Sequence, residues 1–165
     1  NSSKGCTQMV ITSNSSRAHT GQAGRRGVMI ALSLWPHIKV TPEGGREDKA
    51  GTDGYGFGLF GEERVQIKYD ETIAKTGNVY HEVYEKTKGR PDQPWRVSPH
   101  YASWYIFATL THAWLVPVDV LARLEAGKQL RQISPSSMGF LVSEQALAVF
   151  GCERKALSPH DGNDR

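Results

Sequence analysis

The stretch "GTDGYGFGLFGEERVQIKYD", residues 51–70, decides the fold because it contains two expected strands and the turn between them. In its second half the apolar residues Val65, Ile67 and Tyr69 alternate with the polar residues Gln66 and Lys68. A period of two indicates a strand with one apolar face and one polar face. The sequence "GEE" predicts a hairpin turn that joins a strand over 55–60 to a strand over 63–70.

Further elements are expected on both sides of this hairpin. Apolar residues at helical spacing predict a helix from Gln22 to Trp35, which Pro36 ends. A third strand is expected over 78–86, and Asp119 and Ser143 are expected to cap two later helices. Ser98 followed by Pro99 predicts a short helix, and "SWYIFAT" (103–109) and "AWLVPV" (113–118) predict two more strands. This order predicts an α/β fold with a mixed central β-sheet flanked by helices.

The length and composition indicate one domain. A chain of 165 residues with 38% hydrophobic residues supplies one ordinary core. We expect a flexible N-terminal arm over 1–20, a single α/β domain over 21–151 and a polar C-terminal tail over 152–165. The net charge of +3 permits binding to phosphate groups but does not demonstrate it.

Several classes of protein are not favoured by the sequence. It has no apolar run of the length that crosses a bilayer and no apolar signal segment, so we expect a cytoplasmic protein without a membrane partner. Cys6 and Cys152 lack metal-binding spacing, and the histidines lack HxH or HExxH spacing, so a zinc enzyme is not predicted. His81, on the apolar side of its strand, is expected to be a core histidine. The glycine patterns of nucleotide-binding loops do not occur, so no nucleotide cofactor is expected.

Polar residues of the two strands after the hairpin turn suggest a metal site. If the strands over 63–70 and 78–86 pair as antiparallel neighbours, Gln66 lies opposite Glu82 and Lys68 lies opposite Tyr80. Asp53 reaches the same face from the start of the preceding strand. A magnesium ion prefers oxygen ligands and takes only one or two carboxylates.

The expected metal ligands are Asp53, the amide oxygen of Gln66, the carbonyl of Ile67 and Glu82. Lys68 would orient or deprotonate an attacking water and offset charge on a phosphate oxygen. The expected ion is Mg²⁺ or Mn²⁺, and the expected chemistry is phosphodiester hydrolysis.

These residues resemble the motif of the PD-(D/E)XK nuclease superfamily, which includes restriction endonucleases and Holliday-junction resolvases. The similarity covers roughly residues 22–126 and depends on "GTD", "VQIK" and the order of helix and strands. The resemblance implies a restriction-endonuclease-like core in which Asp53 is the first metal-binding acid and Lys68 is the catalytic lysine. Gln66 stands in the place of the second acid, which weakens metal affinity unless Glu82 or a loop acid such as Asp48 compensates.

Each of these residues also has a simpler interpretation. Alternating polar residues usually form a solvated sheet face, and Glu82 fits equally well in a cross-strand ion pair with Lys68. Basic residues suited to a DNA phosphate rim are Arg25, Arg26, Lys75, Lys88, Arg90 and Arg96. Solvated surface charge is the alternative for each of them. Trp95 either stacks on an unpaired base or anchors its own loop.

The function expected from the sequence is a divalent-metal-dependent DNA endonuclease that uses a metal-activated water. The resemblance also implies a homodimer, because many of these nucleases make two cuts with two sites. The alternative is a non-catalytic nucleic-acid-binding protein that retains the nuclease fold. An unrelated α/β domain remains if Asp53 and Lys68 lie far apart.

Overall fold

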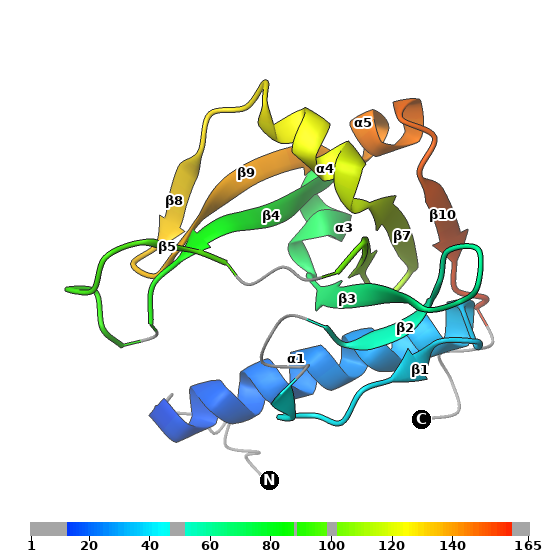
Figure 1. The fold of residues 1–165 in the computed structure, drawn as a ribbon, viewed down its shortest axis with the longest axis horizontal. Helices are drawn as coiled ribbons and strands as arrows, with labels where there is room; N and C mark the ends of the chain where they lie inside the picture. The colour runs from blue at the N-terminus through cyan, green and yellow to red at the C-terminus, as the bar shows by residue number, and fades with distance from the viewer. Residues whose placement is uncertain (1–12, 47–51, 88, 99–101, 160–165) are drawn as a thin grey trace, which may run out of the picture.

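Two β-sheets and four helices make up the described part of the chain (Figure 1). The computed structural model describes residues 13–46, 52–87, 89–98 and 102–159, with side chains from Gly21 onward. The helices are α1 (Ser13–Leu34), α3 (Thr72–Thr76), α4 (Val118–Glu125) and α5 (Glu144–Val149), together with a helical residue at Arg46 beside an undescribed segment. The strands are β1 (Lys39–Val40), β2 (Gly54–Phe57), β3 (Glu63–Tyr69), β4 (Asn78–Glu85), β5 (Arg96–Val97), β6 (Trp104–Ala108), β7 (His112–Pro117), β8 (Arg131–Ser134), β9 (Ser137–Ser143) and β10 (Glu153–Ala156).

The six-stranded sheet, called the mixed sheet below, has the strand order β1-β2-β3-β6-β7-β10. Strand β3 pairs antiparallel with β2 and parallel with β6, and every other pair in this sheet is antiparallel. The predicted α/β class with a mixed sheet and flanking helices is therefore confirmed at this level. The predicted hairpin of β2 and β3 and the two strands β6 and β7 are also present.

Strand β3 has the two faces that its sequence predicts. Val65 and Ile67 lie in an apolar cluster with Ile30 and Ala31 of α1, so this face is covered by the first helix. A Cβ on Gly27 would lie 3.1 Å from the Cβ of Tyr69, which shows how closely α1 approaches the strand. The side chains of Gln66 and Lys68 point to the opposite face of the sheet because successive strand residues alternate.

The predicted pairing of the strand over 78–86 with β3 is wrong. Strand β4 belongs to a second, antiparallel sheet with the order β5-β4-β9-β8, and β6 occupies the edge of β3. The burial of the two strands gives the physical reason. Four of the five residues of β6 are buried, as in a strand covered on both faces, whereas β4 alternates between buried and partly exposed residues. Such alternation suits an antiparallel sheet with one face toward solvent.

The antiparallel sheet packs on the inner face of the mixed sheet, which is the face opposite α1. Tyr105 and Phe107 from β6 share one apolar cluster with Val79 from β4 and Phe140 from β9. His81 is buried in the same layer, with its ring 5.1 Å from that of Tyr105 and edge-on to it. The prediction of a core histidine at this position is confirmed.

The helix boundaries were only partly predictable. Ser143 caps α5 by accepting a hydrogen bond from the backbone N–H of Ala146, as predicted. Helix α4 begins at Val118 after Pro117, so Asp119 lies in the first turn and its predicted role as cap is wrong. Helix α1 begins at Ser13, within the arm expected over 1–20, and residues 1–12 lie outside the described residues. The helix predicted after Ser98 falls on residues 99–101, which are also outside them.

The end of the described chain contributes to the mixed sheet. Strand β10 lies in the segment expected as a polar tail, and it pairs antiparallel with β7. Lys155 of β10 donates a hydrogen bond to the carbonyl of Leu34 at 3.1 Å, and its ammonium lies over the ring of Trp35. The last turn of α1 is therefore hydrogen-bonded to β10, the last strand.

Candidate functional site

Asp53 is held at the point where β2 begins. Its backbone N–H donates to the carbonyl of Val65, and its own carbonyl accepts from the N–H of Thr41, both at 2.9 Å. Its side-chain Oδ2 accepts a hydrogen bond from the backbone N–H of Ile67 at 2.6 Å. The carboxylate of Asp53 therefore lies along the edge of β3. It extends past Gly54, the residue of β2 that pairs with Val65.

Gln66 lies between the two residues of β3 that bind Asp53. The N–H of Asp53 donates to the carbonyl of Val65 and its carboxylate accepts from the N–H of Ile67, the two residues on either side of Gln66. Gln66 is buried, and its neighbour on the other side is Tyr105 of β6.

The backbone of Ile67 completes this group of oxygen atoms. In a strand the N–H and C=O of one residue point to the same neighbouring strand, and they alternate along the chain. The N–H of Asp70 donates to Ala108 of β6, whereas the carbonyl of Val65 accepts from Asp53 on the β2 side. The carbonyl of Ile67 therefore points to the β2 side, where the carboxylate of Asp53 lies.

Lys68 is two residues beyond Gln66 on the same face of β3. It is partly exposed, and its register partner in β6 is the buried residue Phe107. A partly buried lysine packs its aliphatic stem on apolar neighbours and keeps its ammonium in solvent. The structure thus places Asp53 against the backbone of β3 beside Gln66, and Gln66 and Lys68 on one face, without the pairing of β3 and β4 on which the sequence argument depended.

The donor set at this site suits a hard divalent cation. The carboxylate of Asp53, the amide oxygen of Gln66 and the carbonyl of Ile67 are all oxygen ligands of the kind that Mg²⁺ and Mn²⁺ take. The set contains one carboxylate, and among the described residues no group of three or more His, Cys, Asp or Glu side chains could hold a metal ion. Asp48, the loop acid expected to compensate for Gln66, lies outside the described residues.

Glu82 belongs to a different polar cluster. It lies on β4 in the antiparallel sheet, and its carboxylate accepts hydrogen bonds from the hydroxyls of Ser98, at 2.8 Å, and of Ser137. The hydroxyl of Tyr80 is hydrogen-bonded to Ser137 in turn. The pairing that was expected to place Glu82 beside Gln66 does not exist, so its role as a metal ligand loses the geometric argument that supported it.

Most of the basic residues expected at a DNA phosphate rim form ion pairs. Arg25 pairs with Glu43, Arg26 with Glu71, Arg90 with Asp92 and Arg96 with Glu85. Lys75 is exposed in the last turn of α3, and Lys88 lies outside the described residues. Each paired arginine would have to exchange a carboxylate for a phosphate in order to bind DNA.

Trp95 is engaged within its own loop. The ammonium of Lys86 lies 4.8 Å from the centre of the Trp95 ring and donates to the carbonyl of Pro91 at 2.9 Å. These contacts close the segment between β4 and β5 on itself. They agree with the interpretation in which Trp95 anchors its loop.

A second polar cluster, which the sequence did not predict, joins β7 to α5. Glu144 shares a hydrogen bond with the buried side chain of His112 and accepts another from Trp114 Nε1 at 2.8 Å. Partial burial raises the pKa of Glu144, but the hydrogen bonds from Trp114 and His112 outweigh this effect and lower the pKa below its ordinary value. The only signal in the sequence was a histidine, His112, directly before an apolar stretch, and it does not identify the partner.

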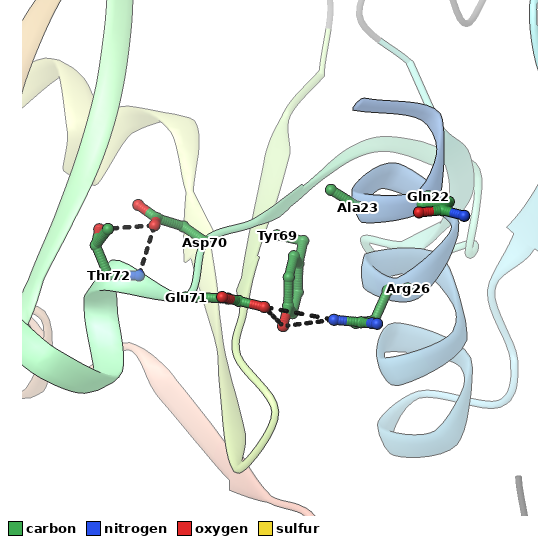
Figure 2. Close-up of a pocket in the computed structure, with 7 residues that line it drawn as sticks. All are labelled: Gln22, Ala23, Arg26, Tyr69, Asp70, Glu71 and Thr72. Atoms are coloured by element: carbon green, nitrogen blue, oxygen red, sulfur yellow. Dashed lines mark hydrogen bonds and ion pairs between the residues drawn. The ribbon is translucent and has the colours of Figure 1, made fainter. Parts of the chain in front are cut away.

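A surface pocket of about 260 Å³ lies where β3 ends and α3 begins (Figure 2). Arg26 of α1 reaches across it to the hydroxyl of Tyr69 and the carboxylate of Glu71. Figure 2 shows these three side chains converging, while Asp70 points toward Thr72. The sequence argument included Arg26 only as a rim residue and did not connect it with Tyr69 or Glu71.

None of the helices in the described part of the chain has the length and apolar character needed to span a bilayer. Comparison of the chain with protein-family models, curated proteins and solved structures found no match.

Proposed function

We propose that the protein is a divalent-metal-dependent deoxyribonuclease with a restriction-endonuclease-like core. The observation that carries the proposal is the hydrogen bond from the N–H of Ile67 to the carboxylate of Asp53, with Gln66 next to Ile67 in β3. It brings three oxygen donors to one edge of β3, with Lys68 on the same face as Gln66. The mixed sheet covered by α1 agrees with the resemblance to the PD-(D/E)XK nucleases.

The residues of this edge have separate roles in phosphodiester hydrolysis. Asp53, Gln66 and the carbonyl of Ile67 would hold the Mg²⁺ or Mn²⁺ ion, which, when bound, supplies Lewis-acid chemistry and attracts the anionic substrate. In the reaction one P–O bond forms to water and another breaks, and the leaving sugar oxygen takes up a proton. Lys68 donates hydrogen bonds to a phosphate oxygen and offsets the negative charge that grows on it in the transition state.

The alternative function is nucleic-acid binding without cleavage. It is favoured by the single carboxylate in the donor set, because replacing the second acid by Gln66 removes one negative charge from the ligands of the ion. A chain that no longer holds the ion would keep the fold and bind DNA through its basic residues. Such binding would weaken as the salt concentration rises.

Cleavage of supercoiled plasmid, branched DNA and single strands in Mg²⁺ or Mn²⁺ tests the proposal. We expect the wild type to cut at least one of these substrates and a chelator to abolish the cut. Lys68→Ala should lower the cleavage rate by about 100-fold or more, because the ammonium acts on the charge of the transition state. Lys128→Ala, which removes an exposed lysine after α4, is the matched control and should cut as the wild type does.

The outcomes separate the two functions. If the wild type binds DNA but cuts none of the substrates with either ion, the binding protein is the better account. If Lys68→Ala and Lys128→Ala cut equally well, another site performs the chemistry.

A further inference from the structure

The pocket at the end of β3 is lined by the sequence neighbour of Lys68, the proposed catalytic residue. Tyr69, which lines it, follows Lys68 directly, and the two side chains leave the strand on opposite faces. The pocket is bounded by α1 on one side and by the start of α3 on the other (Figure 2). The pocket therefore lies on the α1 side of the mixed sheet, one residue along β3 from Lys68.

Three side chains give the pocket a fixed polar wall. Arg26 Nη1 lies 3.5 Å from the hydroxyl of Tyr69 and 3.4 Å from Glu71 Oε1, and the tyrosine hydroxyl donates to the same oxygen at 3.0 Å. Partial burial, followed by the bond to Glu71, raises the pKa of Tyr69, so its hydroxyl keeps its proton at neutral pH. The guanidinium of Arg26 also lies over the tyrosine ring, 5.5 Å from its centre.

The pocket also has polar atoms that are available to a ligand. Asp70 uses Oδ1 to accept from both the N–H and the hydroxyl of Thr72, and the bonds described above use only one oxygen of Glu71. The side-chain amide of Gln22 makes no hydrogen bond to another described residue, although it lines the same pocket. The wall therefore offers carboxylate oxygens as acceptors, with guanidinium and amide groups as donors.

The charge and size of the pocket limit the class of ligand. Two carboxylates, Asp70 and Glu71, outnumber the single guanidinium of Arg26, so the pocket does not suit a phosphate group. A volume of about 260 Å³ is just below the range of about 300 Å³ and upward typical of drug-sized ligands. A small, flat group with both donors and acceptors on its edge fits these conditions, and an exposed nucleobase is such a group.

We propose that this pocket binds an unpaired nucleobase of the DNA substrate, so that the protein prefers DNA with unpaired nucleotides over perfect duplex. The inference rests on the proposed nuclease function. The carboxylate of Glu71 accepts from the amino group of the base, Arg26 and Gln22 donate to its carbonyl or ring nitrogen, and Tyr69 forms the apolar wall. A base that is already unpaired binds without the cost of disrupting a base pair.

The test compares binding to a perfect duplex with binding to the same duplex carrying one unpaired 2-aminopurine. Anisotropy titrations of the full chain in chelator measure binding without cleavage. We expect the wild type to bind the duplex with the unpaired base about tenfold more tightly. We also expect the fluorescence of the 2-aminopurine to change on binding.

Two charge-matched pairs of variants locate the preference. Glu71→Gln in the pocket and Glu43→Gln outside it each remove one negative charge, and both should strengthen binding to perfect duplex slightly. Only Glu71→Gln should reduce the preference for the unpaired base, to within about threefold. Likewise, Arg26→Ala in the pocket should reduce the preference for the unpaired base. Arg25→Ala, at the neighbouring residue of α1, should leave that preference unchanged.

The failure of this inference differs from the failure of the proposed function. Equal affinity for both duplexes, or equal effects of Glu71→Gln and Glu43→Gln, would overturn the pocket assignment even if plasmid is cut. Binding of free deoxynucleosides without any preference within DNA would assign the pocket to a small molecule and overturn it as well. If the protein neither binds nor cuts DNA, the proposed function fails together with the inference.

Discussion

Asp53 and Glu82 were expected to bind the same ion, but they lie in different sheets and have different partners. Asp53 accepts a hydrogen bond from the backbone of Ile67, beside an amide and a lysine of the mixed sheet. Glu82 accepts from two serine hydroxyls, one of them on β9, its neighbour in the antiparallel sheet. A carboxylate placed among other oxygen donors suits a metal site, whereas one that accepts from hydroxyls of separate segments holds those segments together.

The largest effect is expected at the strand pair that carries Glu82. Gly139 of β9 lies opposite Glu82, and a Cβ added there would meet the carbonyl oxygen of His81 at 2.0 Å. Backbone atoms cannot move aside as a flexible side chain can, so Gly139→Ala should lower the free energy of unfolding by about 3 kcal/mol or more. Urea denaturation followed by circular dichroism measures the change.

Gly24→Ala is the control for this substitution. Gly24 lies in α1, where a Cβ would meet nothing within 4 Å, so this change should stabilise the protein by up to about 1 kcal/mol. Equal stability of Gly139→Ala and the wild type would mean that the close approach of β9 to β4 is wrong.

The next effect separates Asp53 from Glu82 in cleavage. Asp53→Asn keeps an oxygen that can accept from Ile67 but removes the charge that would hold the ion. We expect cleavage to slow by about 100-fold, which corresponds to about 2.7 kcal/mol, with little change in stability. Plasmid cleavage over a range of Mg²⁺ concentrations measures both the rate and the demand for the ion. An unchanged rate would exclude Asp53 from the chemistry.

A smaller effect, on stability, is expected at Glu82. Glu82→Ala leaves the hydroxyls of Ser98 and Ser137 without this acceptor and should cost about 2 kcal/mol of unfolding free energy. Glu82→Gln should be milder, because a serine hydroxyl accepts from an amide as readily as it donates to a carboxylate. Cleavage by Glu82→Gln should match the wild type. Loss of cleavage in folded Glu82→Gln would indicate that Glu82 binds the ion together with Asp53. The two acids would then not have different roles.

The smallest effect concerns Glu144, the acid that joins α5 to the mixed sheet. Its pKa is lowered in the folded protein, so its contribution to stability is complete above its ordinary pKa of 4.5 and is lost as the pH falls through the lowered value. Glu144→Gln should therefore cost about 1 kcal/mol at pH 7 and progressively less below about pH 4.5. Urea midpoints of both proteins between pH 3 and pH 7 would show this convergence, while a constant difference would contradict it.

The sequence predicted properties that depend on local pattern. The alternation of Val65, Gln66, Ile67 and Lys68 identified the two faces of β3, and Ser143 identified the start of α5. These predictions succeed because strand period and side-chain capping depend on residues close together in the chain. The approach of Asp53 to β3 from the start of the preceding strand follows from the short hairpin for the same reason.

The partner of each strand could not be predicted in this way. The edges of β3 offer the same backbone groups to any strand, so nothing in residues 63–70 selects β6 over β4. The selection depends on burial on both faces of β6, which becomes evident only when the second sheet is present. The side-chain partners of Arg26 and Glu82 are likewise contributed by residues far away in the sequence.

The bond between Lys155 and the carbonyl of Leu34 has a consequence for the order in which the chain is made. These residues are 121 positions apart, so a growing chain emerges with α1 long before the strand that fastens its last turn. Strand β3 likewise emerges before β6, its parallel partner, because β4 and β5 come between them. The apolar side of α1 thus has its full cover only late in synthesis, and such contacts between distant segments slow folding and expose the nascent chain to aggregation.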